Sequence, residues 1–576
     1  MAYPVPRLES CPQLLLYIGY PILNRQTLYN LCLTNKCMNE CFTPRLYEEV
    51  YFTEENASIL TKADSVNNLM FSDALKYTKV FDLDIPVPTP SYDGYHQDGH
   101  GSGKVTLWNL YNAATASLLR KLTGLTTFSW KGLPLYLSTL STLHAKCPDL
   151  KSLHVTYPRD MEVILLQAAH TSNYWRWKSD RDLALMGQIT YQALPEFSNL
   201  TSLDIRNLHL QVNQITKSIA KVLVASPAIK SLSLSLAQAS VLKCALTRNR
   251  ICDEFLPDMI DAYFTEGGQQ MRLHRLALGF GVRCPYNKDS ARQLSDKKVD
   301  IQKLTHLKGL QELCIHNPFF AMNGSRIPSD GGFVGQNFPP HVCTSLNHLS
   351  FEILSEPLGT WCKQLAAATT GPKQVDLDIM KRNDEYDDGT RVWLEGYITA
   401  PSGTYIKGLE NFWKPNDRSS AHMLNMLTLG KNAWATLDEF PLPTVKHLQA
   451  LSIDTSFHGH YLVARLFNWI GRLKELQQLS IYASNPAANP GSGSHRPAIC
   501  LTASESKELA DDIIALNMTL RYVKVEKWTW RVHYEKEEYE EIAPRLERLD
   551  RFEAREIQAF VANGDPFDCT SNLFRS

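Results

Sequence analysis

A short pattern of hydrophobic positions recurs along most of the chain. Its strict form is Leu-x-x-Leu, then one further residue, then Leu, Ile, Val or Phe. This form begins at Leu150, Leu200, Leu273, Leu310, Leu346, Leu424, Leu448 and Leu476. Looser forms, each with a changed position, begin at Val80, Leu125, Ile229, Val375 and Leu520. About three strict matches are expected by chance from the composition, so most of them are signal.

The end of each motif predicts a short strand followed by a helix. In Leu203-Asp204-Ile205 the apolar and polar side chains alternate, which places them on opposite faces of a strand. Residues 211–226 then carry apolar residues at spacings of three and four, which is typical of an amphipathic helix. One strand and one helix cannot bury their apolar faces alone. We therefore expect successive strand–helix units to stack on one another.

The motif spacing indicates a known repeat type. Leu125 to Leu150 is 25 residues, Leu200 to Ile229 is 29 and Leu448 to Leu476 is 28. From about residue 75 to residue 530 the chain resembles leucine-rich repeat proteins, and the segment from Cys147 to Val155 resembles the cysteine-containing repeats of F-box proteins. The resemblance implies an α/β solenoid with parallel strands on its concave face and helices on its convex face. Its curvature should be irregular because the repeat lengths vary.

The N-terminal segment follows a different pattern. From Gln13 to Val50 we expect short helices that carry no repeat motif. This segment resembles the F-box of fungal F-box proteins, through Leu28, Leu31, Leu33, Asn35, Lys36, Asn39, Pro44, Leu46 and Tyr47. In that family the F-box binds a Skp-type adaptor, which joins a cullin and a RING protein in a ubiquitin ligase. The resemblance implies adaptor contacts at Pro12, Leu15, Ile18, Leu28, Leu31, Leu33, Asn35, Pro44 and Leu46. A helical cap that only covers the first repeat is the structural alternative.

These patterns predict four regions. They are an F-box-like helical domain (1–52), a connector (53–74), the repeat solenoid (75–530), and a C-terminal capping helix with a tail (531–576). The capping helix is expected to begin near Pro544 and to bury Leu546, Leu549, Phe552, Ile557 and Phe560. Loops rich in Gly, Pro and polar residues are expected at 86–104, 317–341, 381–420 and 485–497.

The polar positions of the strands are the candidate substrate site. Parallel stacking should bring them onto one surface, the concave face. They are His154, Asp204, Arg206, Ser233, Arg275, Glu312, His316, His348, Glu352, Asp376, Asp378, Asp454, Tyr482, Lys524 and Glu526. Their mixed charge favours a protein substrate recognised by specific charge pairs. Binding through the projecting loops is the alternative. In this register Leu313 points inward, whereas Glu312 is a surface residue whose loss should cost almost nothing.

Composition and charge narrow the function classes. The chain has 576 residues, is 44% hydrophobic and has a formal net charge of -1. It is therefore expected to fold and to lack the bulk positive charge that binds nucleic acid or anionic membranes. The first residues do not resemble a signal peptide, and no apolar run approaches membrane-spanning length. Thirteen cysteines without a Cys-x-x-Cys pair favour reduced thiols and a cytoplasmic or nuclear location.

No motif predicts a catalytic, metal or cofactor site. Gly99 to Lys104 lacks the spacing and the Ser/Thr of a phosphate-binding loop, and Cys32, Cys37 and Cys41 lack zinc-ligand spacing. The sequence therefore favours a non-catalytic substrate-recognition subunit of an SCF-type ubiquitin ligase, with no cofactor. A repeat scaffold or inhibitor unconnected with ubiquitination is the first alternative. An enzyme with a site on its loops is the second.

Overall fold

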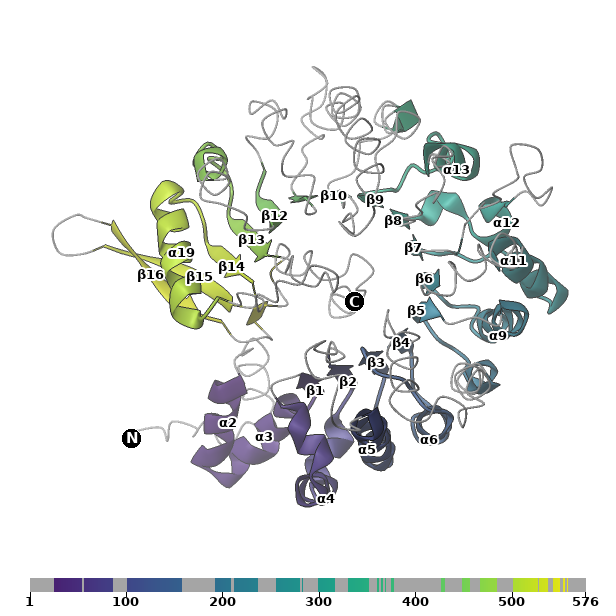
Figure 1. Cartoon of the computed structure of the whole chain (residues 1–576), viewed down its shortest axis with the longest axis horizontal. Helices are drawn as coiled ribbons and strands as arrows, with labels where there is room; N and C mark the ends of the chain where they lie inside the picture. Colours follow the sequence, from purple (N-terminus) through teal and green to yellow (C-terminus); the bar gives the residue numbers. More distant parts are fainter. Residues whose placement is uncertain are drawn as a thin grey trace, which may run out of the picture. The chain divides into compact units, whose positions relative to one another are not determined.

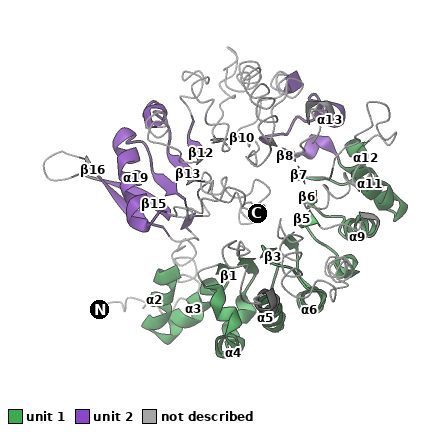
Figure 2. Cartoon of the chain, viewed as in Figure 1, with its two compact units in different colours: residues 1–273, 278–305 green, residues 274–277, 306–576 purple. Residues whose placement is uncertain are grey.

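The computed structural model of the chain divides into two compact units. Unit 1 comprises residues 1–273 and 278–305, and unit 2 comprises residues 274–277 and 306–576 (Figure 2). Isolated residues apart, the structure describes 25–53, 56–85, 101–157, 192–208, 212–236, 255–279, 299–315, 330–351, 374–377, 426–429, 448–455, 467–483, 501–526, 528–536 and 542–549.

Unit 1 is an α/β structure built on a row of parallel strands. The strands are β1 (Glu49–Thr53), β2 (Val80–Asp84), β3 (Thr127–Lys131), β4 (Ser152–Thr156), β5 (Ser202–Leu208) and β6 (Ser231–Leu236). Each pairs in parallel with the next strand in sequence. The α-helices are α2 (Arg25–Thr34), α3 (Lys36–Leu46), α4 (Ala63–Met70), α5 (Gly101–Leu119), α6 (Leu137–Lys146), α9 (Val212–Val224), α11 (Phe255–Thr265) and α12 (Ile301–Leu304). Short 3-10 helices are η2 (Ala57–Thr61), η3 (Asp73–Tyr77) and η5 (Leu194–Glu196). Helices α4, α5, α6 and α9 lie along one side of the strand row (Figure 1).

Unit 2 continues the same design and ends differently. It contains most of β7 (Arg275–Leu278), followed by β8 (Glu312–Ile315), β9 (His348–Phe351), β10 (Gln374–Leu377), β11 (Met426–Leu429), β12 (Ala450–Thr455), β13 (Gln478–Ala483) and β14 (Tyr522–Val525). From β8 to β14 each strand pairs in parallel with the next. Strands β15 (Trp528–Lys536) and β16 (Ile542–Arg548) then add in antiparallel fashion. Its helices include η7 (Leu307–Gly309), α13 (Asp330–Asn337) and α19 (Ala503–Leu516).

The hydrophobic motifs coincide with the strands. All thirteen motif positions fall on or directly before β2 to β14, which confirms the predicted α/β class with parallel strands. The apolar motif residues form the core, and Leu153, Leu203 and Leu313 are at most 1% exposed. In unit 1 the core also contains an aromatic series in which Phe81 stacks on Phe128 at 5.5 Å between ring centroids.

A backbone turn recurs before the strands and explains why the motif can repeat. At Leu125, Leu150 and Ile229, the N–H of the first motif residue donates to the carbonyl three residues earlier. The next residue then donates to the equivalent residue of the preceding motif, as Lys151 does to the Thr126 carbonyl at 2.7 Å. The Sγ of Cys147 donates to the Leu122 carbonyl at 3.4 Å and so fastens one of these turns to the turn before it.

Several predicted boundaries are wrong. Strand β1 occupies the end of the expected helical domain and already pairs with β2, while η2, α4 and η3 form the expected connector. Helix α5 begins inside the expected loop 86–104, and α13 lies inside the expected loop 317–341. The expected loops 381–420 and 485–497 lie outside the described residues.

The predicted start of the C-terminal helix is also wrong. Pro544, its expected first turn, lies within β16, which pairs with β15 over seven register positions. Leu549 and Ile557 are buried against Ala450, as their apolar character required. Leu549 directly follows the β15–β16 hairpin, whereas Ile557 comes after the helical residues Glu553 and Ala554. Phe552 and Phe560 lie outside the described residues.

Candidate functional site

Helices α2 and α3 form a pair with a small core of its own. Leu28, Cys41 and Phe42 are buried at its centre, and further apolar side chains pack around them, namely Leu31, Cys32, Cys37, Met38 and Leu46. The Asn35 side chain accepts a hydrogen bond from the Met38 N–H at 2.8 Å and caps α3. The two helices therefore hold each other in a defined arrangement immediately before β1.

The helix pair is tied to the first strand through polar side chains. The Arg25 guanidinium donates to the carbonyls of Leu46 at 3.0 Å and Glu49 at 2.6 Å, and it lies 5.0 Å from the centroid of the Tyr51 ring. The Asn56 side chain accepts from the Thr53 N–H at 2.7 Å and donates to the Tyr51 carbonyl at 3.2 Å. The bonds to the Glu49 and Tyr51 carbonyls and to the Thr53 N–H occupy backbone groups of β1, the first strand of the sheet, and so cover part of its edge.

The pair leaves an apolar surface on α2. Leu33 is 66% exposed and Tyr29 is 49% exposed. Their spacing of four residues places them on the same side of the helix. We call Tyr29 and Leu33 the α2 apolar face. The resemblance included Leu33 but not Tyr29, although the four-residue spacing could have indicated it.

The other expected adaptor contacts are less accessible. Leu28 is 3% exposed because it packs inside the helix pair, which corrects the expectation that it contacts a partner directly. The half-buried positions are Leu31, Asn35, Pro44 and Leu46. Pro12, Leu15 and Ile18 lie outside the described residues.

The polar strand positions of unit 1 are brought together in register. Asp82 of β2, Ser129 of β3, His154 of β4, Asp204 of β5 and Ser233 of β6 lie side by side in the parallel pairing. All five are at most 3% exposed. His154, Asp204 and Ser233 thus share one face of the strands, as the alternation predicts, and Asp82 and Ser129 join them there. The expectation that His154, Asp204 and Ser233 face a partner directly is wrong, because these side chains are buried.

Asp204 forms a buried ion pair with Arg206, two residues later on the same strand face. Arg206 Nε and Nη2 donate to the two carboxylate oxygens at 2.7 and 2.5 Å. His154 Nδ1 lies 3.5 Å from Asp204 Oδ2. Burial by itself raises the pKa of Asp204, but the hydrogen-bonded Arg206 guanidinium and the nearby His154 outweigh it and lower the pKa to about 2. Arg206 is 3% exposed and pairs with Asp204, so its guanidinium does not face a partner as expected.

A second cluster of one carboxylate, one arginine and one histidine lies in unit 2. Arg275 Nη1 donates to Glu312 Oε2 at 2.9 Å, and His348 Nδ1 lies 3.7 Å from the same oxygen. Burial opposes ionisation of Glu312, yet His348 and Arg275 lower its pKa to about 2. The Glu312 side chain is 25% exposed and the Arg275 side chain 8%. The expectation that Glu312 is a surface residue without a structural role is therefore wrong.

The remaining predicted strand positions are placed only in part. Lys524 is half-buried on β14, and Glu526 Oε2 accepts from the Leu501 N–H at 3.0 Å. Asp376 belongs to β10, and Asp454 of β12 is the register partner of Tyr482 of β13. His316, Glu352 and Asp378 lie outside the described residues.

A more accessible row of polar residues lies at the ends of the unit 1 strands. Thr53, Asp84, Lys131 and Thr156 are register neighbours on β1 to β4, and all four are half-buried. We call these four residues the strand-end row. Sequence reasoning missed Asp84 and Lys131, although both continue the strand alternation by one further step.

Two features of the described residues bear on metal binding and thiol chemistry. They include no group of three or more His, Cys, Asp or Glu side chains that could hold a metal ion. Burial raises the pKa of Cys147 and of Cys343 to about 12, so these thiols are poor nucleophiles. Among the helices described, none is long and apolar enough to cross a bilayer.

No family model matches the chain, and no curated protein matches it. The helix pair and the strand-end row are therefore interpreted from their own geometry.

Proposed function

We propose that the chain is a non-catalytic substrate-recognition subunit of an SCF-type ubiquitin ligase. In this proposal residues 25–46 belong to an F-box that binds a Skp-type adaptor, and the strand–helix units are leucine-rich repeats that bind a protein substrate. The α2 apolar face is the main support for this proposal. Leu33 is 66% exposed there, although the helix pair has a hydrophobic core of its own. An apolar surface that internal packing does not need is typical of a contact with another protein.

The strand-end row is the part of unit 1 that suits a substrate contact. Its side chains are half-buried, so they are held in place and still reachable. Asp84 and Lys131 carry opposite charges at neighbouring register positions. Because the row combines both charges with two threonines, it suits a protein surface of mixed polarity and not a uniform polyanion. The buried Asp204 and Glu312 clusters would instead stiffen the strands that carry the contact residues.

The adaptor contact can be tested by copurification. We expect the chain, coexpressed with a Skp-type adaptor, to copurify with it. Leu33→Asp should abolish copurification, because burying an unpaired carboxylate in an apolar contact costs several kcal/mol. Leu516→Asp is the matched control: Leu516 is 45% exposed on α19 and receives the same substitution far along the chain. Unchanged adaptor binding by Leu33→Asp would refute the assigned surface.

The same experiment distinguishes the ligase proposal from the alternative of a repeat scaffold or inhibitor. A repeat scaffold or inhibitor that is not part of a ligase would bind its partner through the strand–helix units. It would bind the adaptor neither as the wild type nor as Leu33→Asp. Leu28→Asp is unsuited to this purpose, since Leu28 is buried in the helix pair and its change would unfold the pair.

A further inference from the structure

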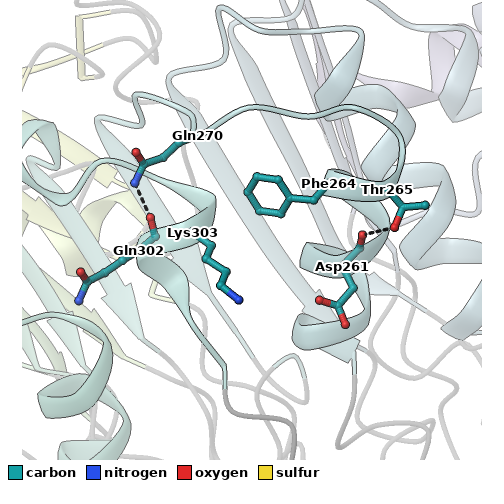
Figure 3. Close-up of a pocket in the computed structure, with 6 residues that line it drawn as sticks. All are labelled: Asp261, Phe264, Thr265, Gln270, Gln302 and Lys303. Atoms are coloured by element: carbon teal, nitrogen blue, oxygen red, sulfur yellow. Dashed lines mark hydrogen bonds between the residues drawn. The ribbon is translucent and has the colours of Figure 1, made fainter.

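A groove on the helical side of unit 1 has the features of a second binding site. It lies between the end of α11 and the α12 segment and has a volume of about 810 Å³. It is open to solvent along its length. Six side chains line it, which are Asp261, Phe264, Thr265, Gln270, Gln302 and Lys303 (Figure 3).

The walls of the groove are held in place by internal bonds. The Tyr263 hydroxyl donates to the Gln269 carbonyl at 2.5 Å, and Gly267 turns the chain with a φ of 89°. Gly268 packs so closely on the Tyr263 ring that an added Cβ would lie 2.4 Å from it. On one side of the groove, the Gln270 side-chain amide donates to the Gln302 carbonyl and so joins the segment after α11 to the α12 segment (Figure 3). The groove therefore exists before any partner arrives, which reduces the entropy cost of binding.

The lining offers three kinds of contact at once. Phe264 is 38% exposed, and its ring is fixed edge-on against Tyr263 at 5.4 Å between centroids. The exposed Asp261 carboxylate belongs to the α11 wall, and the exposed Lys303 ammonium belongs to the α12 wall (Figure 3). Within the described part of the chain, neither charge has an ion-pair partner. Opposite charges thus flank an aromatic ring across an open groove.

We propose that this groove binds a peptide segment of a partner protein that carries a basic residue, an apolar residue and an acidic residue in turn. The basic side chain would meet Asp261, the apolar one would cover Phe264 and the acidic one would meet Lys303. An open groove cannot enclose a small molecule, whereas a peptide that crosses it gains further contacts on both sides. The proposal does not depend on the ubiquitin-ligase function, because it uses neither the helix pair nor the strand-end row.

A displayed library of random twelve-residue peptides, selected against the full chain, tests the proposal. We expect the selected peptides to share a basic and an acidic residue on either side of an apolar one. Asp261→Lys and Lys303→Glu should each weaken a selected peptide by about tenfold, since attraction becomes repulsion at one end. Reversing the matching charge in the peptide should restore the affinity.

Two controls show whether an effect is specific to the groove. Glu266→Lys changes an exposed acidic residue of the same turn that does not line the groove, and it should leave the affinity within about twofold. Adaptor binding should be unchanged in all three variants, which separates this proposal from the proposed function. Selected peptides without the paired charges, or peptides that bind both charge-reversed variants as tightly as the wild type, would overturn it.

Discussion

The buried Asp204–Arg206 pair makes a quantitative prediction about unit 1. We consider Arg206→Met, which keeps most of the side-chain volume and removes the charge. The Asp204 carboxylate, 2% exposed, would then lose its bidentate partner and, among the described residues, would retain His154 at 3.5 Å. Removing one partner of a buried ion pair costs about 3–5 kcal/mol, because the other charge stays desolvated.

The pKa of Asp204 gives a second route to the magnitude. Folding lowers it from an ordinary value of 3.8 to about 2, which corresponds to about 2 kcal/mol in favour of the folded state at neutral pH. Because the folded pKa is the lower one, this stabilisation is complete above about pH 4 and is lost as the pH falls towards 2. Both estimates predict that Arg206→Met lowers the free energy of unfolding by a few kcal/mol at pH 7.

Native-state hydrogen exchange with mass spectrometry measures this effect locally, without requiring the whole chain to unfold in one step. Peptides over β4 and β5 should exchange faster in Arg206→Met by the factor that corresponds to that free energy. Arg120→Met, at an exposed position of unit 1, should have little effect. The double variant Asp204→Asn/Arg206→Met should lose less than Arg206→Met alone, since no unpaired charge remains. Exchange in Arg206→Met at the wild-type rate, or a larger loss in the double variant, would refute the reasoning.

Three further changes test other parts of the structure. Leu313→Ala should cost about 2–5 kcal/mol by leaving a cavity at a position that is 1% exposed, and Gln311→Ala, at an exposed neighbour, should lie within about 0.5 kcal/mol of wild type in thermal unfolding. Glu312→Ala should cost about 1–3 kcal/mol in the same assay, because the Arg275 side chain is 8% exposed and loses its carboxylate; a neutral result would return Glu312 to the role of a surface residue. Asn56→Ala should accelerate hydrogen exchange in β1, and unchanged exchange there would show that the strand edge does not depend on this side chain.

The strands were predictable because their signal is local. A leucine motif with alternation fixes both the strand and its buried face, and β2 to β14 all carry it. Strand β15 has the alternation without the leading motif, with Trp530 and Val532 buried. Leu546 of β16 and Leu549, which directly follows it, have the spacing of three that is also typical of a helix. Pairing with β15 is what makes this segment a strand.

The accessibility of the candidate site residues was not predictable. Alternation correctly placed His154, Asp204 and Arg206 on one strand face, but their burial depends on neighbours that the local pattern does not specify. The same limit applies to α2, where apolar residues occur on several sides of the helix. Packing against α3 is what buries Leu28 and leaves Leu33 exposed.

The most direct test of the ubiquitin-ligase proposal is hydrogen exchange of the full chain with and without a purified Skp-type adaptor. The proposal predicts slower exchange on addition of the adaptor in peptides covering 25–46, with the strands β2 to β14 unchanged. An adaptor that causes no protection, or that protects the strands and not the helix pair, would contradict it.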